Sequence, residues 1–191
     1  MGQSRNIKGA TENSGAICTV LFKSKLNNNM HQKENNFAFI DNTNVHKGIQ
    51  MLGWKLDLAK FRRLLSERYG VVRAYMFIGY LAGNQDMYRD FQNMGYTLIF
   101  KPTLPNKNGE VKGNCDAELV LQVMIDICEY EKAVIVTGDG DFQCVVKYLR
   151  KIGKLGFVIS PNRKWCSILL KREARQNHVF IEEMQSKLEL K

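Results

Sequence analysis

The sequence predicts an α/β protein in which helices cover both faces of a mostly parallel, doubly wound sheet. Short apolar segments alternate along the chain with longer segments of helical spacing, which is the pattern of strand–helix–strand units. The segment Ala133–Val136 is continuously apolar, as expected for a central strand covered on both faces. Gly70, Gly95 and Gly153 follow helical segments, where glycine is a common stop signal. These observations predict a three-layer α/β/α domain.

The elements are expected in a regular order after a polar lead-in. Residues 1–36 are polar apart from 16–22 and predict a flexible N-terminal segment, whereas residues 37–191 form the predicted domain. Strands are expected over 37–40, 71–78, 96–100, 133–136, 155–159 and 179–181. Helices are expected over 56–69, 84–94, 115–130, 141–152 and 162–175. Residues 101–113 carry prolines, glycines and asparagines and therefore predict a loop.

Charge and cysteine content narrow the class of protein. The chain has 28 Lys and Arg against 19 Asp and Glu, a net charge of +9, which favours a polyanionic partner such as nucleic acid. No apolar run approaches the roughly 18 residues that span a bilayer, and no signal-peptide order is visible. The five cysteines are widely spaced and form no CxxC pair, which predicts buried free thiols rather than a zinc or disulfide framework. A cytoplasmic location is therefore expected.

Four aspartates lie at the ends of predicted strands or at the starts of predicted helices. Asp41 follows the first strand, Asp116 begins an apolar helix, and Asp139 and Asp141 lie between a buried strand and a helix. Carboxyl ends of parallel strands meet at one edge of the sheet, where ligands bind. Carboxylates gathered there would repel one another, and Mg²⁺ or Mn²⁺ is the simplest neutralising partner.

Structural roles compete with this interpretation at several of these positions. Asp41 and Asp116 are also suitable helix N-caps, and Asp141 is suited to cap the helix that follows it. Asn44 is expected either to support Asp41, to contact a substrate phosphate, or to form an Asx turn. No Walker phosphate loop and no GxGxxG after the first strand is present, so ATP- and NAD-dependent chemistry lack support.

Three motifs resemble one known family. Asp41-x-x-Asn44, Lys112-Gly-x-x-Asp116-x-Glu-Leu and Thr137-Gly-Asp-Gly-Asp-Phe142 are similar, in this order, to NYN domains of the LabA-like group, relatives of PIN-domain ribonucleases. The resemblance covers residues 37–184 and implies a PIN-like, Rossmann-like fold. It also implies RNA cleavage that leaves 5′-phosphate and 3′-hydroxyl ends.

The resemblance further implies the roles of individual residues. The residues implied to hold Mg²⁺ or Mn²⁺ and to be catalytic are Asp41, Asp116, Asp139 and Asp141, with Asn44 in support. Two departures are visible, because Gln122 and the pair Asn177-His178 stand where related domains often carry acidic residues.

A basic segment predicts where RNA would bind. Residues 147–175 carry nine Lys and Arg and one acid, Glu173, a density that suits phosphate binding. We expect Lys112, Arg163 and Lys164 to contact RNA and Trp165 to stack on a base, unless Trp165 is turned inward.

The predicted function is a metal-dependent ribonuclease acting on single-stranded or structured RNA, without a protein nucleophile. Two alternatives stay open, a non-catalytic RNA-binding or regulatory NYN module and, more weakly, a phosphatase. A homodimer is also left open.

Overall fold

The computed structural model describes residues 34–101 and 115–191. The expected flexible segment, the loop after residue 101 and Lys112 lie outside the described residues, apart from the ends of those segments. Within the described ranges, no helix is long and apolar enough to cross a membrane.

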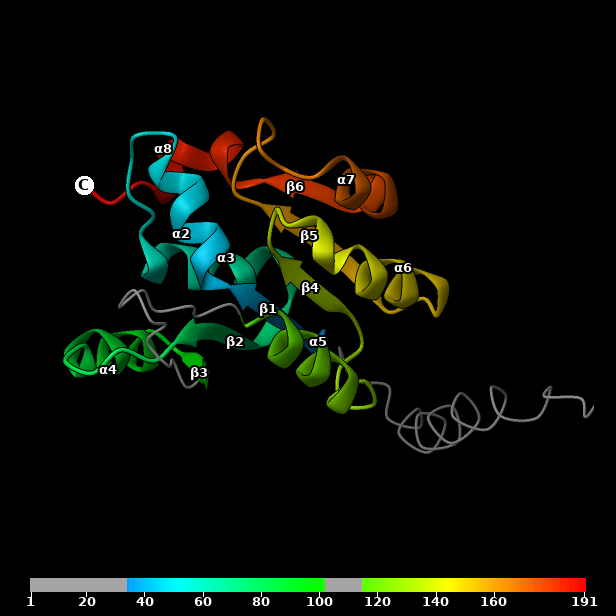
Figure 1. Ribbon diagram of the computed structural model, residues 1–191, viewed down its shortest axis with the longest axis horizontal. Helices are drawn as coiled ribbons and strands as arrows, with labels where there is room; N and C mark the ends of the chain where they lie inside the picture. The colour runs from blue at the N-terminus through cyan, green and yellow to red at the C-terminus, as the bar shows by residue number, and fades with distance from the viewer. Residues whose placement is uncertain (1–33, 102–114) are drawn as a thin grey trace, which may run out of the picture. The chain divides into compact units, whose positions relative to one another are not determined.

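A six-stranded sheet with strand order β3-β2-β1-β4-β5-β6 forms the centre of the described unit (Figure 1). The strands are β1 Asn36–Asp41, β2 Val71–Gly79, β3 Tyr96–Lys101, β4 Ala133–Val136, β5 Leu155–Ser160 and β6 His178–Phe180. Every neighbouring pair in this sheet is parallel, so all six carboxyl ends lie at one edge. The order changes direction between β1 and β4, which is where open sheets of this kind place their ligand sites.

Helices cover both faces of this sheet. They are α2 Asn42–Gln50, α3 Leu58–Tyr69, α4 Gln85–Asn93, α5 Asp116–Ile125, α6 Gln143–Lys151, α7 Ile168–Ala174 and α8 Gln185–Leu188, with short 3₁₀ turns at Gly140–Phe142, Arg175–Asn177 and Ile181–Met184. Side chains of α5, α6 and α7 share one buried cluster, and those of α2, α3 and α8 share the other. The predicted three-layer α/β/α fold is confirmed.

The alternation of strand residues divides the core between the two faces. In β1, Phe37 and Phe39 point into the cluster under α5, whereas Ala38 and Ile40 point into the cluster under α2 and α3. The central strand Ala133–Val136 is fully buried on both faces, as its continuous hydrophobicity predicts.

The helix predictions need three corrections. The turn-like residues after Asp41 begin helix α2, which the sequence analysis missed because Asn and Thr are weak helix formers. The helix expected over 162–175 is confined to Ile168–Ala174, since residues 161–167 form an irregular connection. The helix expected over 115–130 ends at Ile125.

The prediction of buried free thiols is right for two cysteines and wrong in the burial of a third. Cys115 and Cys166 are buried free thiols, as expected. Cys144 is free but exposed, because the buried face of α6 is formed by Val145, Val146 and Leu149.

Candidate metal centre

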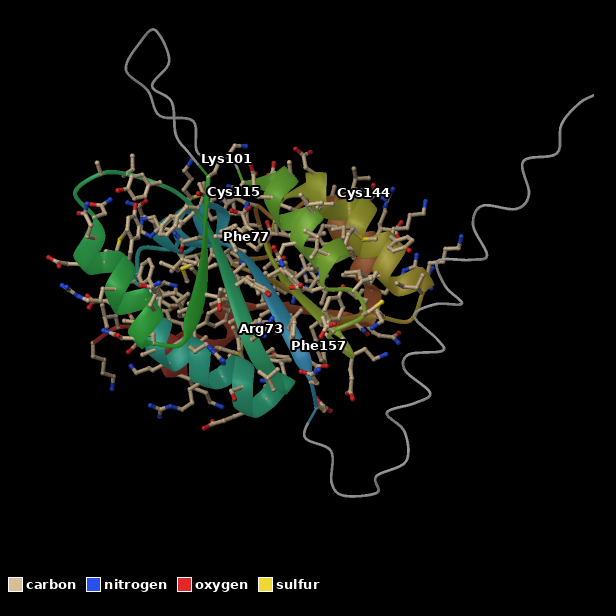
Figure 2. All side chains as sticks on the ribbon, turned by 90° about the horizontal axis from the view of Figure 1, so that it is seen from below. Arg73, Phe77, Lys101, Cys115, Cys144 and Phe157 are labelled. Atoms are coloured by element: carbon tan, nitrogen blue, oxygen red, sulfur yellow. The ribbon has the colours of Figure 1, made fainter. Side chains whose placement is uncertain are left out.

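Three of the four predicted aspartates meet at the carboxyl edge of the sheet. Carboxylate oxygens of Asp116, Asp139 and Asp141 all lie within 4.8 Å of one another. Asp116 is the first residue of α5, and the other two belong to the turn between β4 and α6. Figure 2 shows Cys115 and Cys144, at the starts of α5 and α6, at the same end of the sheet as Lys101.

Asp41 lies beside this trio and binds two neighbours. Its Oδ1 accepts a hydrogen bond from the backbone nitrogen of Asn44 at 3.0 Å, so Asp41 is the N-cap of α2. Its Oδ2 accepts from the hydroxyl of Thr137 at 3.2 Å. Burial raises the pKa of Asp41, and the nearby charges of Asp116 and Asp139 raise it further. The Asp41 carboxylate therefore caps α2 and at the same time lies beside the other three aspartates.

The turn that carries Asp139 and Asp141 is held by its own polar groups. The Asp139 nitrogen donates to the hydroxyl of buried Thr137 at 3.2 Å, and the Asp141 nitrogen donates to Asp139 Oδ1 at 3.1 Å. The Gly138 nitrogen donates to the side-chain oxygen of Asn44 at 2.7 Å. Asn44 thus fastens the start of α2 to the β4 turn, which supports Asp41 indirectly.

The two glycines of this turn are explained by close packing rather than by unusual backbone angles. Neither has a positive φ. A Cβ on Gly140 would lie 2.5 Å from Ser167 Oγ, and one on Gly138 would lie 3.3 Å from Asn44 Oδ1. The segment before α7 therefore presses directly against the acidic turn, and its backbone is joined there by the bond from Ser167 N to Gly138 O at 2.9 Å.

Helix capping explains Asp41 and Asp139 but neither of the other two aspartates. Cys115, and not Asp116, is the N-cap residue of α5, so capping does not account for Asp116. Asp139 caps the short Gly140–Phe142 turn, and Phe142 occupies the N-cap position of α6, so Asp141 caps neither.

A buried polar chain lies behind Thr137. The Ser160 hydroxyl donates to the Thr137 carbonyl oxygen at 2.7 Å and lies 2.8 Å from His178 Nε2. Since that hydroxyl proton is used, Nε2 of His178 carries the proton and donates to Ser160. Burial, with the charges of Lys171 and Arg163, lowers the pKa of His178 to about 4. A neutral histidine therefore stands at one of the two positions where the resemblance implies an acid.

The second departure, Gln122, turns to the end of its own helix. Its amide nitrogen donates at 2.9 Å to Oδ2 of Asp126, the residue that follows α5. Closer to the trio, Glu118 pairs with Lys101 at 3.4 Å.

The predicted RNA-contacting residues have different surroundings. Trp165 is 45% exposed, so the inward alternative is wrong, and the Lys164 ammonium lies 4.8 Å from its ring centroid. Arg163 pairs with Glu183 at 2.5 Å and lies over the ring of Phe180, so protein groups already engage it. Because Ser167 bonds Gly138 and Cys166 packs against it, the backbone that carries Trp165 passes beside the acidic turn.

The donor set suits a hard divalent cation. Three carboxylates from two elements converge, and oxygen donors of this kind are those that Mg²⁺ and Mn²⁺ prefer. The raised pKa of Asp41, caused first by burial, reflects in part the negative charge concentrated there. Sequence reasoning named Thr137 in a motif without giving it a role and missed Ser160; the signal for both was a polar residue at the end of a buried strand.

Comparison with known proteins gives three findings. The sequence model of the NYN domain matches residues 37–182, more than half of the chain. The Low amplitude and bright protein LabA of Synechococcus elongatus is 30% identical over 123 residues, which cover 59% of this chain and 66% of that protein, just under two thirds. A crystal structure of a protein of unknown function from Vibrio parahaemolyticus superposes with a TM-score of 0.70 at 19% identity, covering 84% of this chain and 99% of that one.

Proposed function

Because this chain belongs to the NYN domain family, we propose that it is a metal-dependent ribonuclease that hydrolyses phosphodiester bonds in RNA. The observation that carries the proposal is the convergence of Asp116, Asp139 and Asp141 at the carboxyl edge of the sheet. The basic chain, with a net charge of +9, supplies the long-range attraction for a polyanion.

In this proposal Asp116, Asp139 and Asp141 hold Mg²⁺ or Mn²⁺, and Asp41 completes the acidic site from β1. When bound, such a cation makes water nucleophilic at neutral pH and neutralises charge on phosphate oxygens. Thr137 fixes the orientation of the Asp41 carboxylate through its hydroxyl. Asn44 holds the acidic turn against α2, so the carboxylates are positioned before substrate arrives.

Two exposed groups beside the site are suited to substrate. Trp165 offers a partly exposed ring for stacking on a base, and Lys164 adds a cation beside that ring. Lys112 and Arg163 stay predicted RNA contacts, with Arg163 available only if RNA phosphate competes with Glu183. The cytoplasmic location and the homodimer also stay predictions.

The test is cleavage of a labelled single-stranded RNA in Mn²⁺, Mg²⁺ or EDTA. We expect metal-dependent cleavage by the wild type, at least a hundredfold loss in Asp139→Asn, and unchanged cleavage in Asp90→Asn, an exposed aspartate on α4. Cleavage at the wild-type rate in Asp139→Asn contradicts the proposed site.

A second candidate function is an RNA-binding or regulatory module without turnover. The observation that favours it is the pair of neutral residues, Gln122 and His178, at positions where the resemblance implies acids. The same assay separates the two functions, because this alternative expects RNA binding with no products under any metal condition.

A further inference from the structure

Three aromatic side chains pack together where β2 and β3 end. Tyr80 follows β2, Phe100 belongs to β3, and Tyr88 belongs to α4. The ring centroids of Tyr88 and Phe100 are 4.8 Å apart, and the Tyr80 centroid lies 5.6 Å from that of Phe100 and 5.9 Å from that of Tyr88. Tyr88 is buried, whereas Tyr80 is 41% and Phe100 is 37% exposed. We call these three residues the aromatic shelf.

The aromatic shelf is fixed in place by backbone hydrogen bonds. The Tyr88 hydroxyl accepts from the nitrogen of Leu81 at 2.9 Å and donates to the carbonyl oxygen of the same residue at 3.2 Å. The Tyr80 nitrogen donates to the carbonyl oxygen of Lys101 at 3.0 Å. Rings held in this way lose little conformational entropy when a flat partner binds them. Exposed apolar surface on such a rigid support is typical of a binding site.

The aromatic shelf and the acidic trio lie at the same edge of the sheet, the shelf beside α4 on the face of α2 and α3 and the trio at the start of α5 on the other face. Lys101, whose backbone holds Tyr80, also pairs with Glu118 in the first turn of α5, two residues after Asp116. Figure 2 shows Lys101 next to Cys115, the residue that precedes α5. In the β1–β2 pairing Asp41 lies opposite Phe77, three residues before Tyr80. The aromatic shelf and the acidic trio therefore share the carboxyl edge of the sheet.

Sheet order sets the aromatic shelf on one side of the acidic trio and Trp165 on the other. The strands β2 and β3 lie beyond β1, whereas β5, which leads to Trp165, lies beyond β4. Exposed rings therefore lie at strand ends on both sides of the acidic edge in the order of the sheet.

We propose that the aromatic shelf is a base-binding surface of this site, on which unpaired bases of the RNA stack. This inference rests on the proposed ribonuclease function. Bases in a duplex are already stacked on one another, whereas unpaired bases are free to stack on aromatic side chains. The mechanism is tolerant of sequence, because every base has a flat face.

The test is binding of a fluorescent single-stranded RNA, measured by anisotropy in EDTA so that no cleavage occurs. We expect Tyr80→Ala and Phe100→Ala each to weaken binding about tenfold, within the range for losing one stacked base. The control is Val72→Ala, because Val72 is 42% exposed, nearly the same as Tyr80, and lies at the start of β2, the opposite end of that strand from Tyr80. Binding of this control should stay within twofold of the wild type.

A second probe separates stacking from other effects. An oligonucleotide of the same length with abasic positions keeps the phosphates but lacks bases, so the Ala variants and the wild type should bind it equally. Tyr80→Phe, which keeps the ring, should bind RNA like the wild type, and Tyr80→Leu, which keeps only apolar area, should not. Thermal melting of each variant checks the fold.

Three results overturn the inference in distinguishable ways. RNA binding by the wild type with no loss in the Ala variants removes the aromatic shelf and leaves the ribonuclease proposal standing. Full RNA affinity in Tyr80→Leu, or equal losses of affinity by the Ala variants for the RNA and for the abasic oligonucleotide, shows that the aromatic shelf does not act by stacking and favours a protein-docking surface. No RNA binding by the wild type removes both proposals together.

Discussion

Replacing Asp141 by Asn should have opposite effects on stability with and without a divalent cation. Its carboxylate lies within 4.8 Å of those of Asp116 and Asp139, where two unit charges repel by about 0.9 kcal/mol at a water-like dielectric and about 3.5 kcal/mol at an effective dielectric of about 20. Asp141 is exposed, so the smaller value is the better guide.

The pair with Asp116 counts most for stability. Asp139 and Asp141 are also neighbours in the unfolded chain, so part of their repulsion is present in both states. We therefore expect Asp141→Asn to stabilise the cation-free protein by about 1–2 kcal/mol, a rise in Tm of roughly 3–6 °C for a domain of this size. With Mn²⁺ at a hundredfold excess over its Kd, the wild type should gain about 2.7 kcal/mol. The variant should gain less than half of that, because it lacks one oxygen donor of full charge.

The assay is thermal unfolding of the wild type, Asp141→Asn and Asp90→Asn in EDTA and in Mn²⁺. Asp90→Asn removes the same charge from an exposed position on α4, and it should change Tm little under either condition. The reasoning is refuted if Asp141→Asn matches Asp90→Asn in EDTA and matches the wild type in its response to Mn²⁺.

Three further predictions concern the groups that support the site. His178 has a folded pKa of about 4, so the unfolded chain takes up its proton first as the pH falls. Between pH 6.5 and pH 4 the free energy of unfolding should therefore fall by about 1–2 kcal/mol, a figure discounted because His178 is only partly buried. Urea titrations across this range should show a flatter pH profile in His178→Asn than in the wild type. Asn44→Ala leaves the Gly138 nitrogen without its 2.7 Å partner, so unfolding by urea should show a loss of about 1–3 kcal/mol and calorimetry a weaker Mn²⁺ affinity. Gly140→Ala places a Cβ 2.5 Å from Ser167 Oγ and should lower the free energy of unfolding by about 1–3 kcal/mol. The double variant with Ser167→Gly should recover most of this loss, and equal Tm values for the single and double variants would contradict the packing argument.

Much of the fold could be predicted because its signals are local. The continuous apolar run Ala133–Val136 became the buried central strand, and Gly70 ends α3 with a φ of 61°. Helix α2 was missed for the same reason, since the local signal of Asp-Asn-Thr-Asn is a turn, and burial of Val45 and Ile49 against the sheet overrides it. The helix predicted over 162–175 begins only at Ile168, because Asn162 Oδ1 accepts a hydrogen bond from the Trp165 nitrogen at 2.9 Å and holds an irregular connection.

The candidate site was predictable in its residue types and less so in its arrangement. Strand ends with aspartates were visible in the sequence, and parallel strands bring such ends to one edge. Which carboxylates lie closest was not visible, and neither was the reason for the two glycines. Gly140 is required by the approach of Ser167, a residue from another element.

The sequence by itself determined the alternation of strands and helices, the basic balance of charge and the chemistry available at the strand ends. Only the tertiary structure decided that Asp41 both caps α2 and accepts a hydrogen bond from Thr137, 96 residues away. It also decided that Tyr80, Tyr88 and Phe100, from separate elements, pack together with Tyr80 and Phe100 partly exposed. The physical reason is that backbone propensity depends on near neighbours, whereas distances between side chains depend on how distant segments pack.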